Sequence, residues 1–141
     1  MIAEDYVSFE VAKLLKEKGF DLPCHATYDT AVTGGKPKFS EYEVLNYFPY
    51  GMKNSDDKYS MVISAPTLQM AMKWLRENFN MNPVPYATSI GWYFEVFDLT
   101  QRDVTGCALL YQVGIPSKEK TFETCEEACE AGIRYCLENL I

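Results

Sequence analysis

The sequence is short of basic residues and of long apolar runs. Its 13 lysine and arginine residues stand against 20 aspartate and glutamate residues, which gives a net charge of −7 at pH 7. Nucleic-acid binding gains most of its affinity by neutralising phosphates, so this balance argues against a DNA or RNA binder. The longest unbroken apolar run, Cys107–Tyr111, has five residues, whereas a membrane-spanning helix needs about 20. We therefore expect neither nucleic acid nor membrane as a partner.

The first residues also lack the positive charge of a signal peptide, because Glu4 and Asp5 stand there instead. The five cysteines are odd in number and follow no recurring pair spacing. A chain without an export signal meets a reducing compartment, in which thiols stay unpaired. The sequence therefore predicts a cytoplasmic protein with free cysteines.

Catalytic motifs are scarce, because the chain has a single histidine, His25. His25 is poorly placed to activate the neighbouring Cys24 thiol as a nucleophile, because adjacent side chains of a strand point to opposite faces. No G-x-S-x-G elbow is present, and Pro37 follows Gly34–Lys36 where a phosphate-binding loop needs a hydroxyl. Neighbouring acids lie in predicted turns or on solvated helix faces. We predict no catalytic residue and no cofactor, and the chain leans away from an enzyme.

What the sequence does contain is enough apolar material for a core. It has 141 residues, of which 48% are hydrophobic and 14% aromatic. A chain of this length buries roughly two thirds of the surface that its unfolded form exposes. We predict a single globular domain over residues 1–141.

Capping residues mark three amphipathic helices. Ser8 is the N-cap of the first helix and Gly19 occupies the position after its end. Ser64 is the expected N-cap of the second helix, and Thr124 with Glu127 forms a capping box at the third. The predicted helices span residues 9–18, 65–79 and 124–139.

Strands are predicted where aromatic and β-branched residues gather. The strongest is 90–99, which has apolar residues at alternate positions and pairs with 107–113. Pro83 and Pro85 indicate an extended or looping segment before it. Further strands are expected at 24–28, 42–48 and 58–64. The order α-β-β-(β)-α-β-β-α predicts an α+β fold with three helices and an antiparallel sheet of about four to five strands.

Three cysteines of the last helix, Cys125, Cys129 and Cys136, lie within about 40° of one another around its axis. A zinc site is one interpretation, but such sites take four ligands with loop-borne spacing. The stripe is flanked by Ile133, and a buried free cysteine behaves as a small hydrophobe. We therefore favour core packing and predict no metal site.

The aromatic residues are in excess, with ten Tyr, eight Phe and two Trp. Met70 and Trp74 lie on one line of the second helix, away from its apolar stripe. Tyr93 and Phe97 are expected to project from the strand opposite to Trp92 and Phe94. Either other elements cover these side chains, or they form an exposed patch of the kind that binds partners. The candidate partner- or ligand-binding residues are Met70, Trp74, Tyr86, Tyr93 and Phe97.

Three segments also carry a family resemblance: Ser8–Asp21 (SFEVAKLLKEKGFD), Ala65–Glu77 (APTLQMAMKWLRE) and Glu127–Ile141 (EACEAGIRYCLENLI). Together they resemble uncharacterised small proteins of Bacteroides-type gut bacteria and their prophages. The matched segments cover under a third of the chain, and that family has no assigned activity or site residues to carry over. The resemblance implies an intracellular, mobile-element setting and action by binding rather than by catalysis.

The leading hypothesis is a small acidic interaction module of phage or prophage type that acts on a host or phage protein. It rests on the acidic balance, the aromatic excess and the missing catalytic motifs. One alternative is a small-molecule-binding domain or unrecognised enzyme with an aromatic-lined pocket near Tyr86–Phe97. The other is a homo-oligomeric structural component. The sequence leaves the identity of the partner open.

Overall fold

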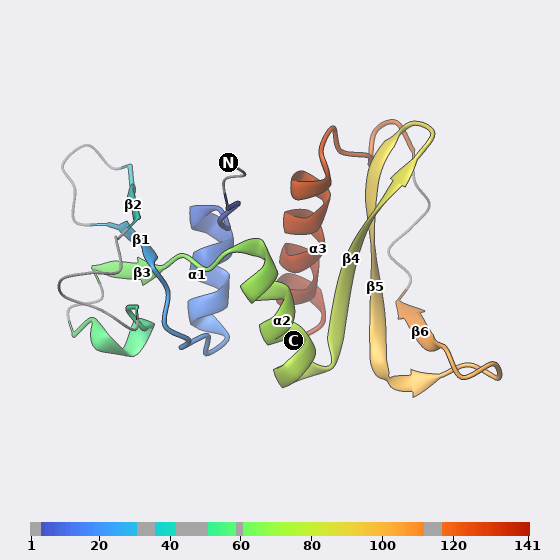
Figure 1. Cartoon of the computed structure of the whole chain (residues 1–141), viewed down its shortest axis with the longest axis horizontal. Coiled ribbons are helices and arrows are strands. Elements are labelled where there is room, and N and C mark those ends of the chain that lie inside the picture. Colours follow the sequence, from blue (N-terminus) through green and yellow to red (C-terminus); the bar gives the residue numbers. More distant parts are fainter. Residues whose placement is uncertain (1–3, 31–35, 42–50, 59–60, 112–116) are drawn as a thin grey trace. The chain divides into compact units, whose positions relative to one another are not determined.

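The computed structural model of the chain describes residues 4–30, 36–41, 51–58, 61–111 and 117–141. Over these residues it contains three α-helices and two three-stranded antiparallel sheets (Figure 1). The predicted α+β class is therefore confirmed. The chain divides into two compact units, Met1–Thr67 and Leu68–Ile141, each described below by itself. Whether the two fold as the single domain expected from the sequence stays a prediction.

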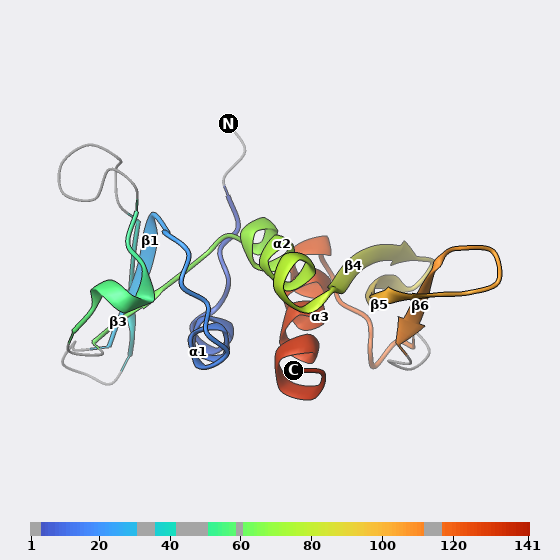
Figure 2. The same ribbon diagram turned by 90° about the horizontal axis from the view of Figure 1, so that it is seen from below.

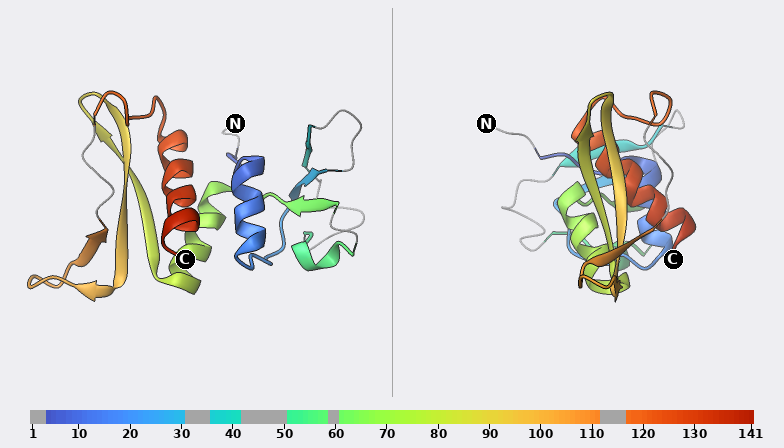
Figure 3. Two further views of the ribbon diagram at one scale, coloured as in Figure 1. Left: turned by 180° about the vertical axis from the view of Figure 1, so that it is seen from behind. Right: turned by 90° about the vertical axis from the view of Figure 1, so that its right-hand side faces the viewer.

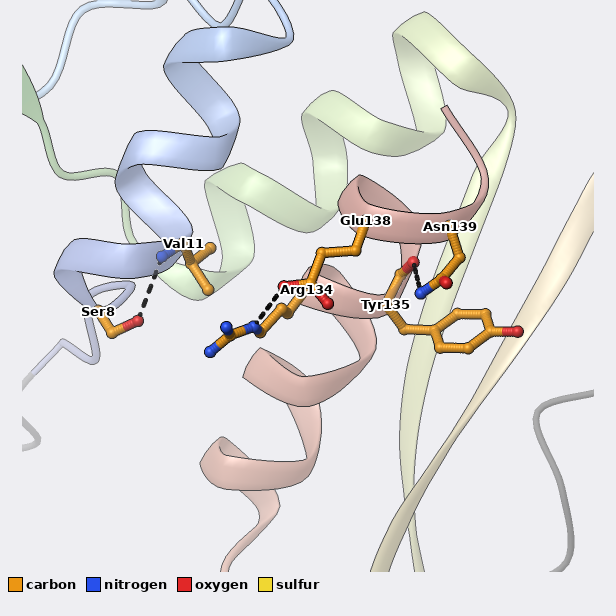
Figure 4. A network of polar contacts seen from close by, with 6 residues as sticks. All are labelled: Ser8, Val11, Arg134, Tyr135, Glu138 and Asn139. Carbon is orange, nitrogen blue, oxygen red and sulfur yellow. Dashed lines mark hydrogen bonds and ion pairs between the residues drawn. The ribbon is translucent and has the colours of Figure 1, made fainter.

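The first unit contains one helix and a small sheet with β1 at its centre, in the order β2-β1-β3. Its elements are α1 (Phe9–Glu17), β1 (Ala26–Asp29), β2 (Lys38–Glu41), the 3-10 helix η1 (Asn54–Asp56) and β3 (Val62–Ser64). The Ser8 hydroxyl accepts a hydrogen bond from the Val11 amide at 3.3 Å (Figure 4), and Gly19 has φ +94° after the helix. Both predicted ends of this helix are confirmed.

A buried amide side chain joins the irregular part of the first unit to its sheet. The Asn54 Nδ2 donates to the carbonyl oxygen of Phe20 at 2.8 Å, and its Oδ1 accepts from the Ser64 amide at 2.9 Å. The Ser64 hydroxyl in turn donates to the Met52 carbonyl at 2.9 Å. Buried backbone groups need such partners when no regular ladder supplies them. Asn54 therefore links three segments that are distant in sequence.

The second unit contains two helices and a sheet with long strands in the order β4-β5-β6. Its elements are α2 (Leu68–Phe79), β4 (Met81–Thr88), β5 (Gly91–Arg102), β6 (Ala108–Tyr111) and α3 (Cys125–Asn139). Helix α3 packs along β4 and β5, and α2 packs against α3 and β4 (Figures 2 and 3). The Thr124 hydroxyl caps α3 by accepting from the Glu127 amide at 3.1 Å, as predicted, whereas the Glu127 carboxylate accepts from the Glu123 amide at 3.1 Å instead of from the Thr124 amide of the predicted capping box. The exposed pair Arg134–Glu138 spans one turn near the end of α3 at 2.7 Å (Figure 4).

A glycine sets the distance between α3 and the sheet. A Cβ atom at Gly132 would lie 3.1 Å from the Pro83 Cβ and 3.3 Å from the Phe94 Cβ. Real side chains seldom approach so closely, so the absent methyl group lets the helix lie directly on the two strands. The buried residues around this contact include Val96, Ala128, Ile133, Cys136 and Leu137.

The second helix begins later than predicted, and the expected Ser64 cap is wrong. Ser64 belongs to β3, where it pairs with Thr27 of β1. The following residues are also held in extended form, because the Val7 amide donates to the Pro66 carbonyl at 3.0 Å. Pairing between distant segments thus overrides the local capping signal. At the other end of α2, Asn80 alone separates the helix from β4, with φ +54°.

The predicted strand count and order are not confirmed, since the described residues form two sheets of three strands each. One added strand is β4, which contains Pro83 and Pro85. The Leu99 amide donates to the Asn80 carbonyl, so alternation places both prolines where a backbone N–H would point away from β5. An edge strand tolerates proline there, because no ladder donor is lost. The strand expected at 42–48 lies outside the described residues.

Candidate functional site

The structure separates the five candidate binding residues into two groups. Met70 and Trp74 lie on α2, and the Trp74 ring, only 6% exposed, packs edge-on against Phe79 with centroids 5.1 Å apart. Tyr86 lies on β4, with Tyr93 on β5. Tyr93 is 3% exposed, whereas Met70, Tyr86 and Phe97 are half-buried. Trp74 and Tyr93 thus belong to the interior, and a binding role for the set stays a prediction.

Tyr86 and Tyr93 belong to an aromatic cluster that links the sheet to α3. The strand register pairs these two tyrosines, whose rings meet edge-on at 5.9 Å. The Tyr93 ring stacks at 5.3 Å on Phe94, although strand alternation predicts opposite directions for the two side chains. Phe94 also contacts Tyr135 of α3 at 5.8 Å and Phe122 at 6.5 Å. The rings therefore fill space against one another.

The phenol groups of Tyr86 and Tyr93 are held in their neutral form. Burial raises the pKa of Tyr93, and the nearby Tyr135 phenol raises it further. Burial also raises the pKa of Tyr86, with the Glu95 carboxylate as a second cause. Both causes disfavour a phenolate. The cluster thus provides packing and hydroxyl groups, with no activated nucleophile among these tyrosines.

The exposed large apolar side chains described in the second unit are Ile90, in the turn between β4 and β5, and three residues on and beside β6. Leu109 is 38% and Leu110 48% exposed. Val104, in the turn before the strand, is fully exposed. Single exposed apolar residues are common, but three within seven positions concentrate apolar surface at one hairpin, with Leu109 and Leu110 expected on opposite faces of the strand. We call Val104, Leu109 and Leu110 the hairpin patch.

Among the described residues, the backbone of β6 is paired on the side of β5, and β6 is the last strand of its sheet. The Trp92 amide donates to the Phe122 carbonyl on the β6 side of β5, so even-numbered residues of β5 point their backbone groups that way. Their partners on β6 are Leu109, opposite Asp98, and Tyr111, opposite Val96. The amide and carbonyl of Leu110 therefore point outward, away from β5.

The turn before β6 is fixed by a network around Asp103. Its carboxylate accepts from the Thr105 amide at 2.8 Å, from the Thr105 hydroxyl at 2.6 Å and from the Cys107 amide at 3.0 Å. These bonds favour the anion and lower the pKa of Asp103. A loop held in one conformation loses little entropy when it binds. The network therefore presents Val104 in a preformed turn.

The two edges of this sheet differ in chemistry. Residues 104–116 contain no Asp, Glu, Lys or Arg, although 23% of the chain is charged. At the opposite edge, β4 carries Pro83 and Pro85, which supply no outward N–H. Natural sheets usually protect an edge with charge or proline, and only β4 has such protection. Sequence reasoning identified the strand at 107–113 but missed this signal, because strand order decides which strand is an edge.

The five cysteines are all free thiols. Burial raises the pKa of Cys24, Cys129 and Cys136 to about 12, and the Cys129 thiol contacts the Met72 sulfur at 3.2 Å. Cys107 is exposed. The ranges that the structure describes contain no group of three or more potential metal ligands. Cys129 and Cys136 therefore act as packing residues of α3, in line with the core interpretation.

Comparisons with protein-family models, with curated proteins and with solved structures found no match. No helix in the described part of the chain is long and apolar enough to cross a membrane. The function of the chain must therefore be argued from its own surface.

Proposed function

We propose that the chain is a small acidic protein-interaction module that binds an extended segment of another protein along the outer edge of β6. The observation that carries the proposal is the exposure of Leu109 and Leu110 on an uncharged edge strand. Proteins commonly bind extended peptides by adding them to such an edge, where backbone bonds give affinity and side-chain contacts give specificity. The outward backbone groups of Leu110 supply the hydrogen bonds, and the exposed Val104 side chain in its preformed turn supplies a side-chain contact.

The setting of this module is part of the same proposal. The resemblance of three segments to proteins of gut bacteria and their prophages supports a phage or prophage function in the cytoplasm, acting on a host or phage protein. The net charge of −7 supports a partner with basic residues outside the strand-adding segment, because long-range attraction speeds encounter.

The test compares capture of proteins from bacterial host lysate by the tagged chain and by two variants. Leu110→Lys places a positive charge in the hairpin patch. The control Leu22→Lys places the same charge in the first unit, at a leucine that is 41% exposed. We expect a stoichiometric partner with the wild type and with Leu22→Lys, and at least a tenfold loss with Leu110→Lys. Cross-links should map to residues 104–111.

Three outcomes of this capture are informative. Equal capture by Leu110→Lys, with unchanged circular dichroism, would show that the partner binds elsewhere. Recovery of the bait alone would contradict binding of another protein and favour the small-molecule-binding or the homo-oligomeric alternative. Cross-links confined to the first unit would exclude β6 as the docking edge.

A further inference from the structure

We infer that β6 pairs with the β6 strand of a second copy of this chain, antiparallel and about a two-fold axis at Leu110, so that the chain forms a dimer. The inference rests on the proposed role of β6 as a docking edge and names a second copy of the chain as its occupant, in competition with a segment of another protein. It goes beyond that role, because the dimer requires no other protein.

The register of such a pair follows from the direction of the backbone groups. The amide and carbonyl of Leu110 point outward, because Leu109 and Tyr111 face β5. In an antiparallel pair, outward groups must meet outward groups. A two-fold axis at Leu110 meets this condition, since Leu110 then exchanges two hydrogen bonds with the Leu110 of the second copy. Identical strands related in this way form a self-complementary contact.

Charge selects an uncharged strand as the occupant. Each chain has a net charge of −7, so two copies repel one another over most approaches. The strand β6 contains no charged side chain, so pairing of β6 with β6 sets no like charges of these strands opposite each other. An acidic or basic peptide finds no opposite charge on this strand. A second β6 is uncharged and exposes the same leucines.

The leucines of the pair would also cover one another. In the two-fold register the Leu110 side chains of the two copies lie side by side on one face of the joined sheet. Leu110 is 48% exposed in the single chain, and pairing removes apolar surface of this kind from water. The joined sheet would contain six strands, within the common range for sheets.

The other edge of the sheet limits the assembly to two copies. Pro83 and Pro85 on β4 lack the N–H that a further strand would need. With β6 occupied, the other edge among the described strands of this sheet is β4, which carries the two prolines. The association therefore closes as a dimer instead of continuing as a fibre.

The first experiment is light scattering with size exclusion, over a hundredfold range of protein concentration. We expect the wild type to approach twice the molar mass of a single chain as the concentration rises. Leu110→Lys should stay monomeric, because two ammonium groups would meet at the axis, while Leu22→Lys should behave as the wild type. A wild type that stays monomeric over the whole range would overturn the inference, as would a dimer that persists in Leu110→Lys.

A distance measurement tests the register and does not depend on the lysine variant. Cys107 is the exposed thiol, so a spin label can be attached there in a Cys125→Ser background. Each Cys107 lies three residues from the axis, and a strand rises about 3.4 Å per residue, so the two backbone positions should lie about 20 Å apart. Pulsed electron–electron double resonance measures the distance between the two labels. A single distance near this value, lengthened by the labels, supports the pairing. A broad distribution or contact between the labels would contradict it.

The two proposals fail separately. A monomeric wild type whose foreign partner is lost on Leu110→Lys would leave the interaction module standing and remove the dimer. A dimer that is lost in Leu110→Lys, with no foreign protein captured, would support the dimer and contradict binding of another protein.

Discussion

Each unit has a helix followed by three described strands, with the 3-10 helix η1 before the last strand of the first unit, but different interactions hold the two units together. In the first unit the strands have only four, four and three residues, and single side chains such as Asn54 tie the irregular segments to them. In the second unit, β4 and β5 have eight and 12 residues and carry an aromatic cluster under α3. Short strands leave more backbone groups to be satisfied by side chains.

This contrast indicates how each unit should fail. Removing a buried hydrogen-bonding side chain costs the full free energy of leaving its buried partners without hydrogen bonds. An apolar core loses stability in proportion to the side-chain volume removed. Substitutions of comparable size should therefore act through different mechanisms in the two units.

The largest effect is expected for Trp74→Ala in the second unit. Removing a large, 6% exposed ring should lower the free energy of unfolding by about 3–5 kcal/mol, because a cavity replaces it. Urea unfolding followed by circular dichroism measures the change. Leu22→Ala, at a 41% exposed position, should cost less than about 0.5 kcal/mol. A similar small cost for Trp74→Ala would mean that its ring is a surface group available to a partner.

A smaller effect is expected for Asn54→Ala in the first unit. The Phe20 carbonyl and the Ser64 amide would lose their partners, which costs about 2 kcal/mol or more. Both tryptophans, Trp74 and Trp92, lie in the second unit. Tryptophan fluorescence therefore reports on that unit, while far-ultraviolet circular dichroism reports on both.

The two probes also decide whether the chain is one folding domain. If Asn54→Ala shifts both urea transitions together, the units unfold as one, as the sequence predicts. If only part of the circular dichroism signal moves, the first unit unfolds by itself. Asn78→Ala is the matched control, because the Asn78 side chain donates to the Trp74 carbonyl within its own helix. Equal transitions for Asn54→Ala and this control would contradict the role given to Asn54.

The smallest effects are expected at the two helix caps. Ser8→Ala and Thr124→Ala each remove a hydroxyl that accepts from an amide of the first turn, which costs about 1 kcal/mol. Ser8→Thr and Thr124→Ser should restore most of the loss. Thermal unfolding measures all four variants. A loss confined to one unit would show that the other helix is held by packing alone.

The sequence predicted what depends on neighbouring residues. Ser8, Gly19 and Thr124 end their helices as expected, because capping acts within one turn. Ser64 is the contrasting case, since its local signal for a cap lost to pairing with Thr27 of another strand. Pairing of that kind joins segments far apart in the chain, and no local pattern reports it.

The same limit applies to the candidate site. Helical periodicity placed Trp74, and strand alternation placed Tyr93, on faces away from the predicted apolar stripe. Whether such side chains reach solvent depends on the elements that pack over them, which periodicity does not predict. Residues 107–113 were recognised as a strand from composition. That this strand is an edge without charge or proline depends on the order β4-β5-β6, which composition does not encode.

The single-residue connection at Asn80 has a mechanical consequence. Helix α2 ends at Phe79 and β4 begins at Met81, while the Asn80 carbonyl is itself bonded to the Leu99 amide. A one-residue connection cannot extend, so a rotation of α2 relative to β4 would break the hydrogen bond between Asn80 and Leu99 at the start of the β4–β5 pair. A force applied to α2 would therefore be transmitted directly to β4 and β5.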